Sequence, residues 1–383
     1  MYVSGRGTTG FGTILPAIIE FKRGGGNIEE IHMVGTDKNH SIKAKEKAHD
    51  LMKLTGVSVP LKVYPENVQQ DMNAYKHVLE MIEEPACAIV AVPDHLHFEI
   101  TKTCLEHNLH SLVVKPLTSG IDEAHKLIKL AQQNNLYGAV EFHKRWDKQN
   151  LILKDTLADG QLGDPLYAVV EYSQRKSIPA VTFKHWAEKT NILNYLGVHY
   201  IDLMHFVSGS IPVRTMAMGQ KNWLRSKNLN TYDSIQCFIE WEMIDGKRFN
   251  QTIIVNWIDP ETSTAMSDQK FKLIGTLGRF EADQKDRGIS LIVDDHNLEI
   301  INPDFCKSYT SDNGKMLWQG YGIDSTTTFL NDVCSIYKGQ KEPIDFEGFR
   351  PTFKEAVIST AVIEAAGKSL EDSGNWKPVE GLL

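Results

Sequence analysis

Lys115 is a side chain whose type and position indicate chemistry on an oxygen atom. It follows an apolar run and precedes Pro116, so we expect it at the end of a buried strand. In a doubly wound sheet the carboxyl ends of the strands face the ligand crevice. An ammonium group there can bind a substrate oxygen and stabilise the negative charge that develops as a hydroxyl loses its proton. The alternative is a lysine that lies on the surface at a strand end.

A second group of polar, titratable side chains lies further along the chain. Tyr195, His199 and Asp202 are spaced i, i+4 and i+7, which places them on one face of a helix. A histidine titrates near neutral pH, so His199 can take a hydroxyl proton while hydride leaves the same carbon. Asp202 would orient that ring and stabilise its charged form. The alternative is a histidine whose ring is satisfied inside the core.

A glycine-rich turn near the start of the sequence predicts a dinucleotide site. It has the pattern G-x-G-x-x-G and lies between a short apolar strand and a helix-like segment. Glycines let the chain turn tightly and let backbone amides approach a pyrophosphate at the helix N-terminus. We expect cofactor contacts from the whole turn: Gly5, Arg6, Gly7, Thr8, Thr9 and Gly10. The alternative is a strand, turn and helix that bind no ligand.

Asp37 strengthens this prediction because it ends the next apolar run. It lies 27 residues after Gly10, compared with a usual spacing of about 20, and a glycine-rich loop at 24–27 explains the extra length. Its carboxylate can accept hydrogen bonds from a ribose and would repel the 2′-phosphate of NADP. We therefore expect NAD, with NADP as the alternative because Lys38 and Lys43 weaken the preference. Lys38 is also expected beside the cofactor.

Two further segments are expected near the same site. The loop at 92–97 follows an unbroken apolar strand, and its Val92, Pro93, Asp94 and His97 are predicted to line the cofactor. His95 and His97 resemble a metal-binding pair, but no third ligand follows at a useful spacing, so we predict no metal. In the charged run at 141–147, Arg145 and Trp146 are predicted to contact the substrate. A solvated charged turn is an equal alternative for that run.

The elements that must position these residues differ between two parts of the chain. Residues 1–145 alternate short apolar strands, such as Ile31–Val34, with helix-like segments, such as those at 68–83 and 121–133, which predicts an α/β Rossmann domain with a doubly wound parallel sheet. Residues 146–383 are dominated by longer strand candidates, of which 232–243 alternates partly, with Ile235, Cys237, Ile239 and Trp241 on one side. This predicts an α+β domain with a largely antiparallel sheet that has two different faces. The predicted strands of that domain are Pro165–Ser173, Arg214–Lys221, Tyr232–Met243, Phe249–Trp257, Lys270–Gly275, Arg279–Ala282 and Ile289–Val293.

Composition limits the function classes. The 383 residues carry a formal net charge of −8, which gives no reason to expect nucleic-acid binding. The sequence contains no apolar run near the roughly 20 residues of a membrane helix and no signal peptide, so no membrane association is expected. Five scattered cysteines without C-x-x-C spacing indicate reduced thiols and a cytoplasmic protein.

Together these motifs resemble the glucose–fructose oxidoreductase, inositol dehydrogenase and MocA (Gfo/Idh/MocA) family over nearly the whole chain. The family carries the glycine-rich turn, a T-P-N-x-x-H-like loop matched at 92–97, an E-K-P motif and a D-x-G-x-H-x-x-D helix. The resemblance implies a Rossmann domain followed by an open, mostly antiparallel sheet that binds substrate and often pairs subunits into dimers or tetramers. It also implies catalytic positions for Lys115 and His199. The sequence departs from the family where its glutamate is Val114 and its first helix aspartate is Tyr195.

The sequence therefore supports the hypothesis of an NAD(P)-dependent oxidoreductase that acts on a sugar, a polyol or a nucleotide-linked sugar. Lys115, Tyr195, His199 and Asp202 are its predicted catalytic residues, and Lys115, Tyr195 and His199 would also hold the substrate. Two alternatives come from other classes. One is a dinucleotide-binding sensor without turnover, which Val114 and Tyr195 would suit. The other is a glycoside hydrolase that uses bound NAD transiently.

Overall fold

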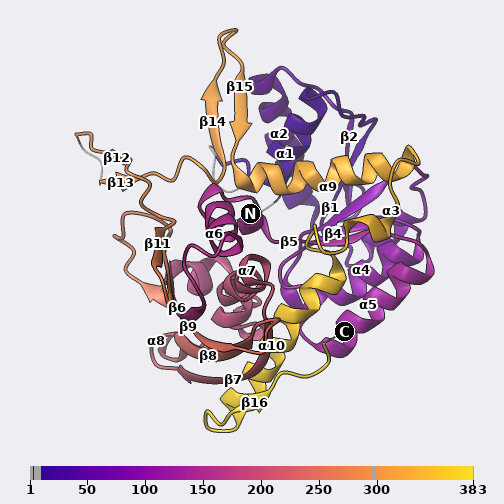
Figure 1. Ribbon diagram of the computed structural model, residues 1–383. Helices are drawn as coiled ribbons and strands as arrows, with labels where there is room; N and C mark the ends of the chain where they lie inside the picture. The colour runs from indigo at the N-terminus through magenta and orange to yellow at the C-terminus, as the bar shows by residue number, and fades with distance from the viewer. Residues whose placement is uncertain (1–2, 4–9, 295–297, 383) are drawn as a thin grey trace.

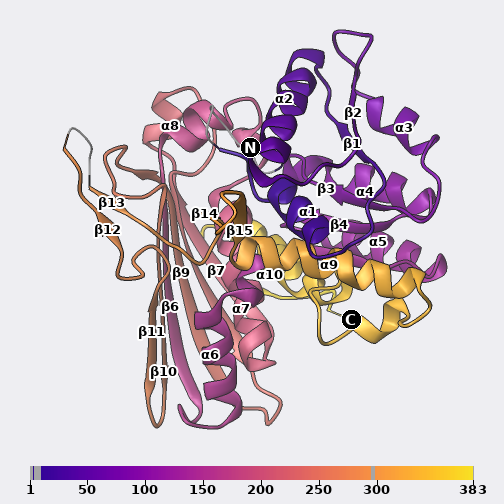
Figure 2. The same ribbon diagram turned by 90° about the horizontal axis from the view of Figure 1, so that it is seen from above.

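A computed structural model describes residues 3, 10–294 and 298–382 of the chain. Figures 1 and 2 show two parts that pack together, a parallel α/β part and a part built on one large sheet. Residues 5–9 of the predicted cofactor turn, namely Gly5, Arg6, Gly7, Thr8 and Thr9, lie outside the described residues. Of that turn, the structure describes Gly10. No helix in the described ranges combines the length and apolar character required to cross a membrane.

The N-terminal part contains the parallel strands that the sequence predicts. One group pairs β1 (Ile31–Val34) with β2 (Leu61–Tyr64), and the other has the order β3-β4-β5. The bounds are Cys87–Val90 for β3, His110–Val114 for β4 and Gly138–Glu141 for β5. Val113 and Val140 are fully buried, as expected for strands that helices cover on both faces. The helices of this part are α1 (Ile14–Arg23), α2 (Lys38–Thr55), α3 (Ala74–Leu79), α4 (His97–Glu106) and α5 (Ile121–Gln133).

The second part is built on a seven-stranded sheet of order β11-β10-β6-β9-β8-β7-β16. Its β6–β9 pair is parallel and the other five pairs are antiparallel, so the predicted open, mostly antiparallel sheet is confirmed. The predicted inward face of β8 is also confirmed, because Ile235, Cys237, Ile239 and Trp241 are buried. Its strands are β6 (Pro165–Arg175), β7 (Ile211–Gln220), β8 (Ser234–Glu242), β9 (Arg248–Asp259), β10 (Ser267–Gly275), β11 (Arg279–Asp283) and β16 (Lys377–Pro378).

Helices from the second half of the chain join the two parts. Helix α10 (Phe353–Glu371) packs on β7 and on α5, and α7 (Val198–Ser208) packs between α6 (Lys148–Ala158) and α10. Helix α9 (Tyr321–Tyr337) instead packs against α1, where Phe329 and Val333 share a core cluster with Phe21, Leu112 and Tyr137. The C-terminal segments therefore complete the core of the N-terminal part.

Smaller elements depart from the sequence prediction. The strand expected at 289–293 is only β12 (Ser290–Leu291), which pairs with β13 (Glu299–Ile300). A projecting hairpin, β14 (Lys307–Thr310) with β15 (Met316–Gln319), was not expected. The one-turn helix α8 is Trp223–Ser226, and short 3₁₀ or π turns cover Asp94–Leu96, His143–Trp146, Ile178–Thr182, Ala187–Lys189, Leu193–Gly197 and Pro343–Phe346.

Candidate active site

The structure brings Lys115 and His199 into one site, although they come from different halves of the chain. Lys115 follows the carboxyl end of β4, and its Nζ donates a hydrogen bond to the Tyr195 carbonyl oxygen. The same Nζ lies 3.8 Å from the centroid of the Tyr195 ring. His199 lies in the first turn of α7, four residues after Tyr195; burial lowers its pKa, and the charges of His143 and Lys115 act in the same direction. An ammonium group and an imidazole thus flank the same region at the edge of the parallel sheet.

The Lys115 ammonium is held in a poorly solvated position. Burial lowers the pKa of Lys115 to about 8, while the carboxylates of Asp94 and Glu141 act in the opposite direction. Asp94 lies in the segment after β3 and Glu141 is the last residue of β5, the two strands on either side of β4. The lysine is therefore charged at neutral pH but loses its proton more readily than a surface lysine.

His199 is placed to accept a proton. Its side chain is buried, and its Nδ1 has no hydrogen-bond partner among the described residues. Burial lowers the pKa of His199 well below its usual value, and the neighbouring His143, Lys115 and Lys144 lower it further. The ring is therefore neutral at physiological pH and can act as a base toward a bound hydroxyl.

Tyr195 precedes α7 in a π turn, Leu193–Gly197, instead of continuing a regular helix with His199 and Asp202 as the sequence predicted. Two features form this turn. The Asn191 side chain accepts hydrogen bonds from the amides of Leu193 and Asn194 at 2.9 and 3.0 Å. A Cβ atom at residue 197 would lie 2.5 Å from Leu193 Cδ1, so the Leu193 side chain would have to shift to admit any other residue there. The turn places the Tyr195 ring against Lys115.

Asp202 does not orient His199, in contrast to the sequence prediction. Both of its carboxylate oxygens accept hydrogen bonds from Arg145, at 2.9 Å from Nε and 2.6 Å from Nη2. Glu355 lies 3.5 Å from the same guanidinium. Arg145 and Asp202 are both buried, because α7 turns Asp202 toward the 3₁₀ turn that carries Arg145. The pair fixes α7 to the segment after β5. Because the Arg145 guanidinium binds Asp202, it is not the substrate contact that the sequence predicted.

Trp146 faces a different region of the molecule. Its Nε1 donates a hydrogen bond to Thr328 Oγ1 at 3.1 Å. It lines a cavity of about 560 Å³, together with Trp318 and Tyr321 from the region of β15 and α9. Neither Lys115 nor His199 is among the described residues that line this cavity.

The loop at 92–97 ties the edge of the parallel sheet together. The buried His97 ring has Nδ1 2.6 Å from the Pro116 carbonyl oxygen and Nε2 3.0 Å from that of Val92. It therefore links the loop after β3 to the turn that carries Lys115. Asp94 accepts a hydrogen bond from Thr190 Oγ1 at 2.6 Å, and this contact joins the loop to the second part of the chain.

The described residues around the predicted cofactor position fit a dinucleotide. Asp37 follows the carboxyl end of β1 and caps α2 by accepting a hydrogen bond from the His40 amide at 3.0 Å. This hydrogen bond lowers the pKa of Asp37, so its carboxylate is ionised and suited to a ribose diol. The first turn of α1 contains no acidic residue, so no carboxylate of that turn would repel a phosphate at its positive end. Lys38 begins α2 beside Asp37.

Three residues of this site were not predicted from the sequence: Glu141, His143 and Lys144. Glu141 ends β5 and pairs directly with Val114 of β4. Because paired residues of neighbouring strands point to the same face, a carboxylate lies across from the position where the family motif has glutamate. Their place in the sequence could have identified them, because Glu141 ends β5 and His143 and Lys144 follow it, as Lys115 follows β4.

Lys144 is the most deeply buried cation of the group. Its Nζ donates hydrogen bonds to Gln269 Oε1, at 2.5 Å, and to Gln284 Oε1. Burial lowers the pKa of Lys144 to about 7. It lies 4.8 Å from the centroid of the Tyr200 ring, on the sheet side of α7.

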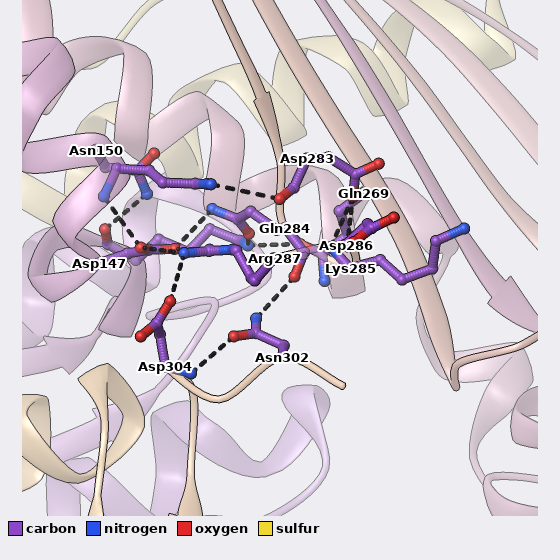
Figure 3. Close-up of polar contacts among 12 residues, drawn as sticks. Asp147, Asn150, Gln269, Asp283, Gln284, Lys285, Asp286, Arg287, Asn302 and Asp304 are labelled. Atoms are coloured by element: carbon purple, nitrogen blue, oxygen red, sulfur yellow. Dashed lines mark hydrogen bonds and ion pairs between the residues drawn. The ribbon is translucent and has the colours of Figure 1, made fainter. Parts of the chain in front are cut away.

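A polar network supports the turn that carries these residues (Figure 3). Asp147 accepts hydrogen bonds from Arg287 Nη2 at 2.8 Å and from Gln284 Nε2 at 3.1 Å. Arg287 also donates from Nη1 to Asp304 at 2.9 Å, so Figure 3 shows its guanidinium between the two carboxylates. The network fixes the connection between β5 and α6 from the side of the large sheet.

Two sequence comparisons relate these features to known proteins. The chain is 26% identical to the scyllo-inositol 2-dehydrogenase (NADP(+)) of Bacillus subtilis over 191 residues, which cover 48% of this chain and 51% of that protein. It is 24% identical to the glucose-6-phosphate 3-dehydrogenase of the same organism, over 50% of this chain and 55% of that protein. The chain thus matches about half the length of these curated relatives.

Solved structures extend the likeness of the fold to most of the chain. An inositol dehydrogenase homologue from Azotobacter vinelandii, solved with NADH and myo-inositol, has a TM-score of 0.67 at 19% identity. The match covers 92% of this chain and 98% of that one. A scyllo-inositol dehydrogenase from Lactobacillus casei has a TM-score of 0.63 at 13% identity and covers 92% and 99% of the two chains.

Family models match both parts of the chain. The model described as "Oxidoreductase family, NAD-binding Rossmann fold" matches residues 30–142, and the model of the GFO/IDH/MocA C-terminal domain matches residues 151–281. The two matches follow each other in the order of the parallel part and the large sheet. The chain therefore belongs to the Gfo/Idh/MocA family of oxidoreductases.

Proposed function

We propose that this protein is a dehydrogenase that transfers a hydride between a nicotinamide dinucleotide and the CH–OH carbon of a sugar, a polyol or a nucleotide-linked sugar. The observation that carries the proposal is the meeting of Lys115 and His199 in one buried site at the edge of the parallel sheet. The membership of the family supports the reaction class. The matched relatives named for inositol and glucose 6-phosphate support the substrate class.

The side chains have distinct roles in this proposal. When bound, the cofactor accepts or supplies the hydride. Lys115 donates a hydrogen bond to the reacting oxygen and stabilises its developing negative charge. His199, neutral at pH 7, takes the hydroxyl proton during oxidation and returns it during reduction. Tyr195 shapes the wall beside Lys115, and the Arg145–Asp202 pair positions α7 without contacting the substrate.

The cofactor is proposed to be NAD, with NADP as the alternative. Asp37 supports this choice because an ionised carboxylate accepts hydrogen bonds from the ribose diol and repels a 2′-phosphate. Val92, Pro93 and Asp94 would line the nicotinamide side, and the turn at 5–10 would bind the pyrophosphate. The ammonium group of the adjacent Lys38 can pair with a 2′-phosphate, which leaves the protein some affinity for NADP.

We also propose that the protein forms a homodimer or homotetramer through the large sheet. On its outward face, Val169, Phe238 and Ile254 are only partly covered within one chain. They lie on neighbouring strands β6, β8 and β9. A second copy packed on this face would remove them from water.

The catalytic assignment is tested with two substitutions. The purified protein is assayed with NAD against a panel of polyols and sugars, and reduced nicotinamide is measured. Lys115→Met and His199→Ala should each lower kcat by at least about 100-fold, because each removes a group that acts in the transition state. Cofactor affinity, measured by fluorescence titration, should remain within a few-fold of the wild type. If either variant retained full turnover, the assignment would be wrong.

A further inference from the structure

Glu141 and His143 form a carboxylate–imidazole pair directly beside His199. Glu141 is 2% exposed, and its Oε2 accepts a hydrogen bond from His143 Nδ1 at 2.9 Å. Its Oε1 accepts a second hydrogen bond from Ser325 Oγ of α9 at 2.6 Å. A buried carboxylate held by two donors keeps a fixed orientation and stabilises a positive charge on the imidazole.

The His143 ring contacts His199 and two aromatic rings. The ring centroids of the two histidines are 4.6 Å apart. The centroid of the His143 ring also lies 5.6 Å from that of Tyr321 and 5.1 Å from that of Phe305. Because Nδ1 donates to Glu141, the neutral His143 ring carries its acceptor on Nε2.

The two histidines have opposite electrostatic environments. His199 faces the cations of Lys115 and Lys144 as well as His143, and its Nδ1 has no partner among the described residues. A proton on His199 is therefore repelled from two sides. A proton on His143 instead meets the Glu141 carboxylate, so positive charge is better placed on the second ring than on the first.

We propose that Glu141 and His143 form a relay that receives the substrate proton from His199 and that also holds His199 in position. The relay rests on the proposed dehydrogenase function. During oxidation the C–H bond breaks and its electron pair leaves as hydride to the nicotinamide, while the O–H proton moves to His199 and the C=O bond forms. The proton then passes to His143, which becomes an imidazolium paired with Glu141. His199 returns to its neutral form, and His143 loses the proton to water when the product leaves.

The kinetic test compares two carboxylate–histidine pairs of this chain. Glu141→Gln and His143→Gln should lower kcat by about 10–100-fold, with KM within about twofold of the wild type, because neither residue binds the substrate. Glu141→Asp keeps the negative charge and should retain more activity than Glu141→Gln. Glu30→Gln is the matched control, since Glu30 pairs with His32 at 2.8 Å at the start of β1, and its kcat should stay within about twofold of the wild type. Unchanged kcat in Glu141→Gln would overturn the relay.

A second measurement does not depend on turnover. Titration of His199 by NMR should give a midpoint well below that of an ordinary histidine. In His143→Gln this midpoint should rise, because the positive charge that His143 places beside His199 is gone. An unchanged midpoint contradicts the relay. A wild-type chain that turns over no sugar or polyol contradicts the proposed function instead, and the titration then decides the relay alone.

Discussion

The charge state of Lys115 gives the site a defined dependence on pH. Burial lowers the pKa of Lys115 to about 8, and that of His199 lies well below its usual value. At neutral pH the lysine is therefore charged and the histidine neutral, which are the forms that oxidation of an alcohol requires. Above about pH 8 the ammonium loses its proton, so the stabilisation of the developing alkoxide is lost.

We therefore expect kcat/KM for oxidation to fall above about pH 8, since this parameter reports the pKa values of the free enzyme. In Lys115→Arg the guanidinium does not titrate in this range, so the falling limb should move to higher pH even though the maximal rate is lower. Steady-state rates from pH 5 to 10 measure both effects. Lys144 also has a lowered pKa, of about 7, so Lys144→Met serves as the comparison. If the falling limb of kcat/KM moved in Lys144→Met but stayed unchanged in Lys115→Arg, the assignment of this limb to Lys115 would be wrong.

At the residue scale, the sequence predicts the groups that follow strand ends but not the contacts between them. Lys115 and His199 were singled out by residue type and local pattern, and the structure brings them together. Glu141 and His143 were passed over because their arrangement depends on the register between β4 and β5 and on the 3₁₀ turn after β5. Asp202 was predicted to pair with His199 because of their spacing on a helix. Its carboxylate instead accepts hydrogen bonds from Arg145, which lies far from it in the sequence.

At the element scale, strand β5 depends on close packing against α10. A Cβ atom at Gly138 would lie 2.4 Å from the Phe353 ring, and Phe353 is buried. Gly138→Ala should therefore lower the free energy of unfolding by about 1–3 kcal/mol, since the ring must shift in a packed core. Urea denaturation measures the change, and adding Phe353→Leu should recover part of the loss.

Gly367 of α10 provides the opposite expectation in the same helix. A Cβ atom there has no neighbour within 4 Å, so Gly367→Ala should raise stability by about 0.5–1 kcal/mol through helix propensity. Equal effects of the two substitutions would show that the contact with Phe353 is not what constrains Gly138.

The sequence predicted the bounds of elements that have a clear local pattern and missed those that tertiary contacts shorten. The bounds of β1 and α5 agree with the expected Ile31–Val34 and Ile121–Gln133. The helix expected at 68–83 is reduced to Ala74–Leu79, because residues 69–71 bond to the loop at Asp37 instead. Such contacts are tertiary and leave no local pattern. The β14–β15 hairpin did have one, the turn signal Asp312-Asn313-Gly314, with Gly314 at φ 75°.

At the scale of the whole molecule, the outward face of the large sheet is the proposed contact between copies. Ile254→Glu should shift the protein to a monomer in light scattering, because a charge in that contact is desolvated without a partner. Ile244→Glu is the control: Ile244 is 95% exposed at the β8–β9 turn and should leave the mass unchanged. A wild-type protein that is already monomeric would exclude this contact.

The segment that covers β5 has a consequence for how the protein is made. Val140 donates its amide hydrogen to the Pro351 carbonyl oxygen, and Phe353 and α9 close the core around Tyr137. A ribosome adds roughly 5–20 residues per second, so the strand that carries Glu141 emerges roughly 10–40 seconds before its cover. During that interval the nascent chain exposes an unfinished apolar surface. Shielding of this surface until residues 329–353 arrive is a task for chaperones, and fast translation of the large sheet would shorten the exposure.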